Sequence, residues 1–367
     1  MYQSFLLSLV AFSGLGFAKP FTQVTKTFSF PFKPHEGVTT VEGISRPGRL
    51  DWPKLSPGPN ATTFDWWYFD AVSKDTNETI VIVADLYGND TLGLPTFGGG
   101  TTVGYIAGNF ANGTLFESFG PATSGTTVKA GPKGINGDWK EAGIKFEGSS
   151  LELPYVTYTV TIDSPSAGIS APHYPCGLNT AGQNQEIVPG VYWANAQPDA
   201  IATADFVVHN ERVAFEGYGY HDKNWGSDNL RRLIRTWYWG HGRVGPYSIV
   251  WFDTLDQHGK KYYSSWITKN GKVVAQSCKD KAVVVEPWGG NTQFPPEPKA
   301  APPNGYTISY DLGDNKAFWA NFTREVDHQV NDIYRRFSGS LCGGIVGGKQ
   351  YEGRAMAEQF QHPALST

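Results

Sequence analysis

Ten residues near the middle of the chain, Gly217–Gly226 (Gly-Tyr-Gly-Tyr-His-Asp-Lys-Asn-Trp-Gly), gather several side chains that could do chemistry. His221, Asp222 and Lys223 can each donate or accept a proton, and Trp225 adds a flat apolar wall with one N–H donor. The three glycines allow the backbone to turn sharply or to approach a ligand closely. The pattern is typical either of a reactive site or of a β-corner whose polar residues cap neighbouring strands.

Two aromatic segments follow this stretch, at 235–241 and 247–253. Because alternate residues of a strand share a face, two mixed faces are expected: Arg235, Trp237, Trp239 and His241, and then Tyr247, Ile249, Trp251 and Asp253. Arg, His and Asp do not suit a purely apolar core face, because burying them unpaired costs several kcal/mol. The mixture indicates an interior cavity for a large, mostly apolar molecule. The alternative is an outward polar face with scattered rings.

We therefore expect one shared cavity with a small polar group inside it. Its expected walls are the substrate-binding residues Trp67, Tyr68, Trp225, Arg235, Trp237, Trp239, His241, Tyr247 and Trp251. Its expected catalytic residues are His221, Lys223 and Asp253. Aromatic residues make up 14% of the chain, a density that suits a roomy pocket lined by rings.

Strand signals recur along the chain, whereas helical periodicity is nearly absent. Short apolar and aromatic runs alternate with turn signals such as Asn112-Gly113 and Asn270-Gly271, which are typical of antiparallel hairpins. The pattern predicts an all-β protein with two antiparallel β-barrel or sandwich domains in tandem. Short helices are expected only near Ser227–Leu233 and Tyr351–Phe360.

The chain divides into two comparable halves around a segment rich in Gly, Pro, Ser and Asn. The expected units are an N-terminal domain at 19–165, a linker at 166–195 and a C-terminal domain at 196–367. The halves also echo each other, since Trp66–Asp70 followed by Ile80–Asp85 resembles Trp237–Trp239 followed by Ser248–Asp253. Two related domains predict a ligand cleft between or inside them.

The first residues include an apolar and small-residue run, Phe5–Phe17. Thirteen residues are too few to span a bilayer, so the run predicts a signal peptide at 1–18 and a location in the secretory pathway, secreted or in an endomembrane lumen. In that compartment five Asn-x-Thr sequons could carry glycans, at Asn60, Asn77, Asn89, Asn112 and Asn321.

Composition narrows the choice of partners. The net charge is −4 and no Lys/Arg-rich run occurs, so lipophilic small molecules are favoured over nucleic acid, and no later segment suits membrane insertion. Three cysteines are too few for a disulfide framework, and no Cys-x-x-Cys or His-x-x-x-His spacing indicates a metal site. Phosphate-loop and dinucleotide motifs are also lacking, and we expect neither a cofactor nor a metal.

Two separated motifs carry a resemblance to a known family. Trp66-Trp67-Tyr68-Phe69-Asp70, followed far downstream by Gly219–Gly226, is similar to the tandem lipocalin-like family of carotenoid hydratases (hydroxyneurosporene synthase) and fungal Diels–Alderases. The resemblance spans roughly Gly37 to Gln359 and implies two lipocalin-like β-domains. With its signal peptide, the chain looks most like the secretory-type hetero-Diels–Alderases of tropolone–sesquiterpenoid pathways.

The resemblance also implies a reaction. The hydratases have a His where this chain has Lys223 and a Tyr where it has Trp251, so two of their acid–base positions are replaced. The other branch implies a cofactor-independent pericyclase of fungal secondary metabolism that couples a tropolone o-quinone methide to a humulene-type sesquiterpene. There, a protonated Lys223 or His221 would hydrogen-bond the quinone methide's carbonyl while Asp253 balances the charge. A terpenoid hydratase or dehydratase and a secreted lipophile carrier are the alternatives.

Overall fold

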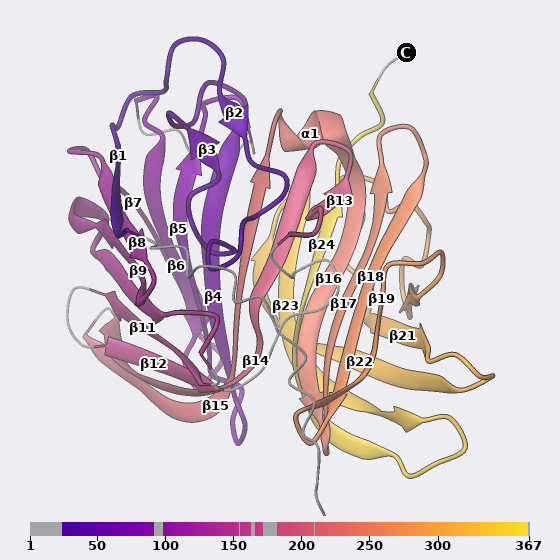
Figure 1. The fold of residues 1–367 in the computed structure, drawn as a ribbon. Coiled ribbons are helices and arrows are strands. Elements are labelled where there is room, and N and C mark those ends of the chain that lie inside the picture. The colour runs from indigo at the N-terminus through magenta and orange to yellow at the C-terminus, as the bar shows by residue number, and fades with distance from the viewer. Residues whose placement is uncertain are drawn as a thin grey trace, which may run out of the picture.

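Antiparallel strands form nearly all of the computed structural model, which describes residues 24–91, 98–153, 155–162, 166–171, 182–208 and 210–365 (Figure 1). The first strands are β1 (Lys26–Phe30), β2 (Thr40–Val41), β3 (Leu55–Ser56), β4 (Phe64–Ser73), β5 (Thr79–Tyr87), β6 (Thr102–Asn109), β7 (Leu115–Pro121), β8 (Thr126–Gly131), β9 (Gly134–Trp139), β10 (Ile144–Ser149), β11 (Val156–Ile162) and β12 (Ser166–Ala171). Then follow β13 (Glu186–Val188), β14 (Val191–Val208), β15 (Glu211–Gly226), β16 (Ile234–Val244), β17 (Tyr247–Asp256), β18 (Lys261–Lys269), β19 (Lys272–Ser277), β20 (Val283–Trp288), β21 (Gly305–Asp311), β22 (Ala317–Val330), β23 (Tyr334–Ile345) and β24 (Tyr351–Gln361). The all-β prediction is confirmed.

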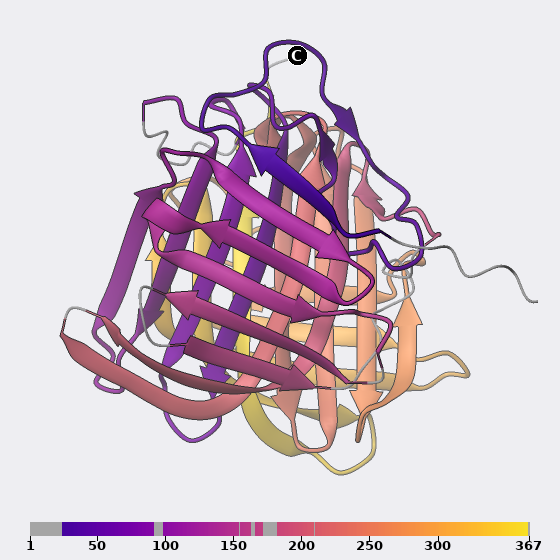
Figure 2. The same ribbon diagram turned by 60° about the vertical axis from the view of Figure 1, so that its left-hand side comes forward.

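The first sheet curls back on itself. Within the described residues it has 13 strands, in the order β1-β8-β9-β10-β11-β12-β14-β15-β4-β5-β6-β7, with β13 paired to β14. Figure 2 shows β8–β12 crossing in front of β4–β7. The two layers enclose a core that includes Trp67, Phe69, Trp139 and Phe146. The ring centroids of Trp67 and Trp139 lie 5.7 Å apart, so large rings fill the space between the layers.

The second sheet curls in a similar way around its own core. Its nine strands, counted over the same described residues, run in the order β19-β18-β17-β16-β24-β23-β22-β21-β20, and β20 touches β17 and β18. Trp251 of β17 points into this core, whereas the next residue, Phe252, belongs to a cluster between the two sheets. The split follows from the two-residue period of a strand, which sends neighbouring side chains to opposite faces.

A third hydrophobic cluster lies where the two sheets face each other. Tyr68 of β4 meets Trp239 of β16 edge to face, with ring centroids 5.5 Å apart. The Tyr68 hydroxyl also donates to the sulfur of Met356 on β24, at 3.2 Å. The two halves that echo each other in sequence thus bring their equivalent strands, β4 and β16, together at this interface.

The two predicted helices had different outcomes. Helix α1 (Leu230–Leu233) lies inside the expected range, and the side chain of Asn229 caps it by accepting from the amide of Arg231 at 2.9 Å. The helix expected at Tyr351–Phe360 is wrong, because this segment is strand β24. Strand β24 is hydrogen-bonded to β16 on one side and to β23 on the other, and these two ladders outweigh local propensity. None of the helices in the described part of the chain has the length and apolarity to cross a membrane.

The chain passes from one sheet to the other later than the predicted linker. The segment 166–195 contributes β12, β13 and the start of β14 to the first sheet, and the passage lies at 227–233, after β15. The long pair β14–β15 explains this difference, because β15 also pairs with β4 and so joins the two halves of the first sheet. The domain limits themselves stay a prediction, and the expected signal peptide lies outside the described residues.

Candidate active site

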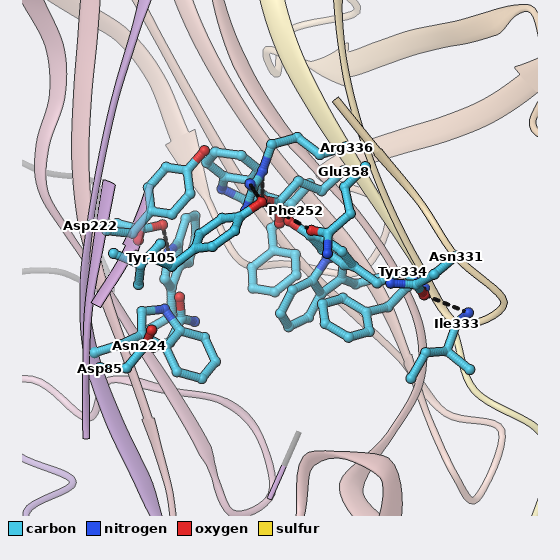
Figure 3. A pocket seen from close by; sticks show the side chains of 18 of the residues that line it. Asp85, Tyr105, Asp222, Asn224, Phe252, Asn331, Ile333, Tyr334, Arg336 and Glu358 are labelled. Carbon is cyan, nitrogen blue, oxygen red and sulfur yellow. Dashed lines mark hydrogen bonds and ion pairs between the residues drawn. The ribbon is translucent and has the colours of Figure 1, made fainter. Parts of the chain in front are cut away.

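A cavity opens in the cluster between the two sheets, with an empty volume of about 890 Å³ that includes space open to solvent. Figure 3 shows its side chains converging from both sheets. Its lining consists of Trp66, Tyr68, Val83, Asp85, Tyr105, Phe119, Trp193, Asp222, Asn224, Trp237, Trp239, Phe252, Gln329, Asn331, Ile333, Tyr334, Arg336, Glu358 and Phe360. Aromatic rings thus dominate the walls, and a few buried polar groups stand among them, as is typical of a small-molecule site.

Strand pairing explains which side chains reach the cavity from the first sheet. Tyr68 of β4 is paired with Val83 on β5 and with Asp222 on β15, so the three side chains share one face. Two residues along, Trp66 is paired with Asp85 and Asn224. The face that looks toward the second sheet is therefore built from alternate residues of β5, β4 and β15.

Asp222 is the most tightly held carboxyl group of the cavity. It is 4% exposed, and its Oδ2 accepts from the indole N–H of Trp193 at 2.7 Å and from the hydroxyl of Tyr220 at 2.9 Å. Its other oxygen, Oδ1, forms no hydrogen bond within the described part of the chain. The side chain is thus fixed through one oxygen while the other remains available to a ligand.

Burial favours the protonated form of the Asp222 carboxyl group. Loss of hydration raises its pKa well above the ordinary value, although the hydrogen bonds from Trp193 and Tyr220 act in the opposite direction. The shift favours the protonated, neutral form of Asp222. A carboxylic acid in a water-poor cavity is a group that can protonate an oxygen atom of a bound substrate.

On the side of the second sheet, Arg336, Glu358 and Tyr334 form a connected polar group. The Nε of Arg336 donates to Oε1 of Glu358 at 3.0 Å, and the hydroxyl of Tyr334 donates to the same oxygen. The guanidinium also lies over the rings of Tyr68 and Tyr105, with its carbon 5.5 Å from each ring centroid. Burial raises the pKa of Glu358, and the charge of Arg336 opposes that shift. These contacts hold one cation at a fixed place beside the cavity.

Three predicted substrate-binding residues line this cavity: Tyr68, Trp237 and Trp239. His241 lies beside them, where its Nε2 contacts Oδ2 of Asp70 at 2.9 Å and its ring stacks on Tyr220. Arg235, at the start of β16, is half-buried and is not part of the lining.

The remaining predicted residues of the first sheet lie on the opposite face of their strands. His221, Lys223 and Trp225 alternate with the cavity-lining residues of β15, and Trp67 alternates with those of β4. They point into the interior of the first sheet. The structure thus does not bring His221 or Lys223 to the cavity.

Each of these inward polar groups has partners of its own. His221 stacks on Phe69 with centroids 4.2 Å apart, and its Nδ1 lies 2.8 Å from the carbonyl of Tyr68. Lys223 forms a fully buried ion pair with Asp65, and its Nζ lies 3.3 Å from the centroid of a Trp67 ring. Burial lowers the pKa of Lys223 and raises that of Asp65.

The predicted residues of β17 face the core of the second sheet. Tyr247 and Trp251 belong to that core. Asp253 is 1% exposed and is held by Nζ of Lys261 at 3.3 Å and by the amide of Val285 at 3.2 Å. Of the three expected catalytic residues, His221 and Lys223 therefore point into the interior of the first sheet, and Asp253 points into the core of the second. The five tryptophans that were expected to line one cavity do not share one.

Asp85, Tyr334, Arg336 and Glu358 were not expected at the site from the sequence, and no role was expected for Asp222. A signal for Asp222 was present, because strict alternation along 217–226 separates it from His221 and Lys223. The same rule groups Tyr68 with Trp66 rather than with Trp67. No comparable signal marks Arg336 and Glu358, since their places depend on which strands become neighbours of β24.

Comparison with known proteins places this curled two-sheet chain in a known family. The model of the Diels-Alderase-like family matches residues 32–288, and the chain belongs to that family. The resemblance to fungal Diels–Alderases stated from the sequence is therefore confirmed.

Two curated relatives share more than 40% of their aligned residues with this chain. The chain is 46% identical over 348 residues to the quinolone epoxide rearrangement protein penF of Penicillium thymicola, covering 92% of this chain and 96% of that protein. It is 44% identical over 343 residues to the quinolone epoxide rearrangement protein asqO of Emericella nidulans, covering 91% and 93%. A solved structure, CghA with Sch210972, has a TM-score of 0.76 at 14% identity and covers 93% of this chain and 100% of its own, a likeness of fold alone.

Proposed function

We propose that this protein rearranges an epoxide carried by a quinolone-type substrate, with the protonated Asp222 as the general acid. The observation that carries the proposal is a buried carboxyl group that lines an aromatic cavity and is anchored through Oδ2 alone among the described residues. The similarity to penF and asqO supports the substrate class, since both are named for quinolone epoxide rearrangement. The reaction belongs to secondary metabolism, as in the family.

The proposed step keeps all atoms of the substrate. Asp222 transfers its proton from Oδ1 to the epoxide oxygen as one C–O bond of the ring breaks, and positive charge develops on that carbon. Migration of a neighbouring group or attack by a nucleophile of the same molecule then quenches the charge. The proton released in that step returns to the carboxylate of Asp222, so the product is an isomer of the substrate.

The walls of the cavity suit the charge that develops. Trp237 and Trp239 of β16 and Phe252 of β17 line it, and the face of an aromatic ring attracts a nearby cation. The same rings keep bulk water away from the cationic carbon, which would otherwise be captured as a diol. Shape and ring faces would thereby select rearrangement over hydrolysis.

A test is to incubate the purified protein with a quinolone that carries a side-chain epoxide and to follow isomer formation by chromatography and mass spectrometry. Asp222→Asn keeps an acceptor for Trp193 but loses the acidic proton, and we expect kcat to fall by about 10² to 10⁴. Asp205→Asn is the matched control, because Asp205 is an exposed partner of Arg212 on the same sheet. An unchanged kcat for Asp222→Asn would remove the acid role.

Cycloaddition is the second candidate, because the family includes Diels-Alderases such as cheD of Chaetomium globosum, which is 24% identical over 343 residues. The tropolone o-quinone methide and humulene pair expected from the sequence is the substrate set for this candidate. Adduct formation of one stereochemistry, with the epoxide left intact, would favour it. Water addition alone would favour a hydratase, and ligand retention without turnover would favour a carrier.

A further inference from the structure

A polar–aromatic–polar row crosses the first sheet at one end of the cavity. Trp66 on β4 is paired with Asp85 on β5 and with Asn224 on β15, and all three side chains line the cavity. Neighbouring strands lie about 4.8 Å apart, so Asp85 and Asn224 start roughly 10 Å from each other across the indole. That span is close to the length of a fused two-ring aromatic molecule.

The two polar ends of this row have no protein partner in the described part of the chain. Asp85 is 3% exposed and Asn224 is 6% exposed, and no hydrogen bond of either side chain is formed there. Buried polar groups are bonded in the great majority of cases, so an unpaired pair facing a cavity indicates a ligand. Lys223, on the other face of β15, differs in this respect, because it is paired with Asp65.

The protonation state of Asp85 defines what it can recognise. Burial raises its pKa to about 8, and the positive charge of Arg336 on β23 acts against the shift. The other titratable groups that line the cavity are Asp222 on β15, Glu358 on β24, Tyr68 on β4, Tyr105 on β6 and Tyr334 on β23. At neutral pH Asp85 is therefore mostly a carboxylic acid, with one donor and one acceptor on neighbouring atoms.

We infer that the Asp85–Trp66–Asn224 row binds a planar lactam whose N–H and C=O lie on the same edge. The acid O–H of Asp85 donates to the lactam carbonyl while its other oxygen accepts from the lactam N–H. The ring system lies over Trp66, and its far edge reaches the amide of Asn224. This inference rests on the proposed function, which it deepens by naming the part of a quinolone that is recognised.

The first test uses 2-quinolone, which carries the lactam edge but no epoxide, and measures binding by tryptophan fluorescence or calorimetry. N-methyl-2-quinolone lacks the donor, and 4-quinolone has its N–H and C=O on opposite sides of the ring. We expect both to bind about 10-fold more weakly or worse, because each loses at least one of the paired hydrogen bonds. Equal affinity for the three compounds would overturn the inference.

Substitutions of Asp85 give the second test. Asp85→Leu keeps the branched outline of the side chain but removes both hydrogen bonds, and we expect 2-quinolone to bind about 10- to 100-fold more weakly. Asp85→Asn restores a donor and an acceptor, so it should bind within a few-fold of wild type. For wild type, affinity should fall as pH rises through 8, since the carboxylate loses its donor. For Asp85→Asn, the affinity for 2-quinolone should not change with pH in this range.

The controls separate this inference from the proposed function. Asp205→Leu changes an exposed carboxyl and should leave binding unchanged. Wild-type affinity in Asp85→Leu, or the same pH dependence in Asp85→Asn, would refute the lactam contact even if the epoxide is rearranged. Conversely, Asp85-dependent binding of 2-quinolone without any epoxide turnover would refute the proposed function and support the lactam contact.

Discussion

Two aspartates of the first sheet, Asp222 and Asp205, show how strongly surroundings control a carboxyl group. The pKa of Asp205 is lowered, because an exposed hydrogen bond from Arg212 stabilises the carboxylate. The pKa of Asp222 is raised, because burial removes the water that would solvate its charge. The surroundings thus favour the anion for the surface side chain and the protonated acid for the one in the cavity, and only a protonated acid can protonate an epoxide.

The hydrogen bond from Trp193 to Asp222 predicts a shift in the pH profile. The reaction needs protonated Asp222, so kcat should fall as pH rises through its pKa. Trp193→Phe removes an N–H that stabilises the carboxylate, so the pKa should rise and the alkaline limb of kcat should move up by roughly one pH unit.

The matched control for this variant is Trp237→Phe. Trp237 lines the same cavity, but its indole N–H has no hydrogen-bond partner within the described residues. The limb should stay in place for Trp237→Phe even if the rate changes. A limb that moves equally in both variants would show that cavity shape, not the hydrogen bond, controls the acid.

At the scale of one element, β15 serves two interiors at once. Tyr220, Asp222 and Asn224 face the second sheet, and the residues between them face the core of the first sheet. The strand pairs with β14 on one side and β4 on the other, so both of its edges are hydrogen-bonded, and residues 219–226 are buried on both faces. A substitution on one face should therefore affect the chemistry, and one on the other face should affect stability.

Lys223→Met tests this division. It leaves Asp65 buried without its cation, which typically costs about 3–5 kcal/mol of unfolding free energy. Urea unfolding should show that loss, and a second substitution, Asp65→Asn, should recover part of it. The kcat of the folded fraction should stay near wild type. A large fall in kcat at unchanged stability would instead support the catalytic role expected from the sequence.

At the scale of the whole molecule, the two curled sheets lie side by side (Figure 1). Each sheet encloses its own core, and the cavity occupies the interface between them. Loops and turns carry four of the five sequons. Asn77, Asn89 and Asn112 are exposed, and Asn60 is half-buried. Asn321 is half-buried within strand β22, which is paired on both sides.

This arrangement predicts selective glycosylation if the chain enters the secretory pathway. Expressed in a secreting fungal host, the protein should carry glycans at Asn77, Asn89 and Asn112, and Asn321 should remain mostly unmodified. Mass spectrometry after glycosidase treatment would locate the modified sites. Complete absence of glycans from the three exposed sequons, in a chain that is otherwise exported, would contradict the expectation.

The sequence by itself determined the class of fold and the family, because both depend on local patterns. Alternation and turn residues are legible along the chain, and the motifs 66–70 and 219–226 mark the family. Alternation also sorts each strand into two faces, so it separates Asp222 from Lys223 without further information.

Only the tertiary structure decided which of those faces meet. Asp85, Asp222 and Glu358 come from strands far apart in the chain, and they share a cavity because the two sheets curl and pack together. Sequence pattern cannot tell a cavity-facing aromatic such as Trp239 from a core-facing one such as Trp251, since both are large and alternate in the same way. The same limit explains the error at β24, whose strand state comes from two neighbours contributed by distant parts of the chain.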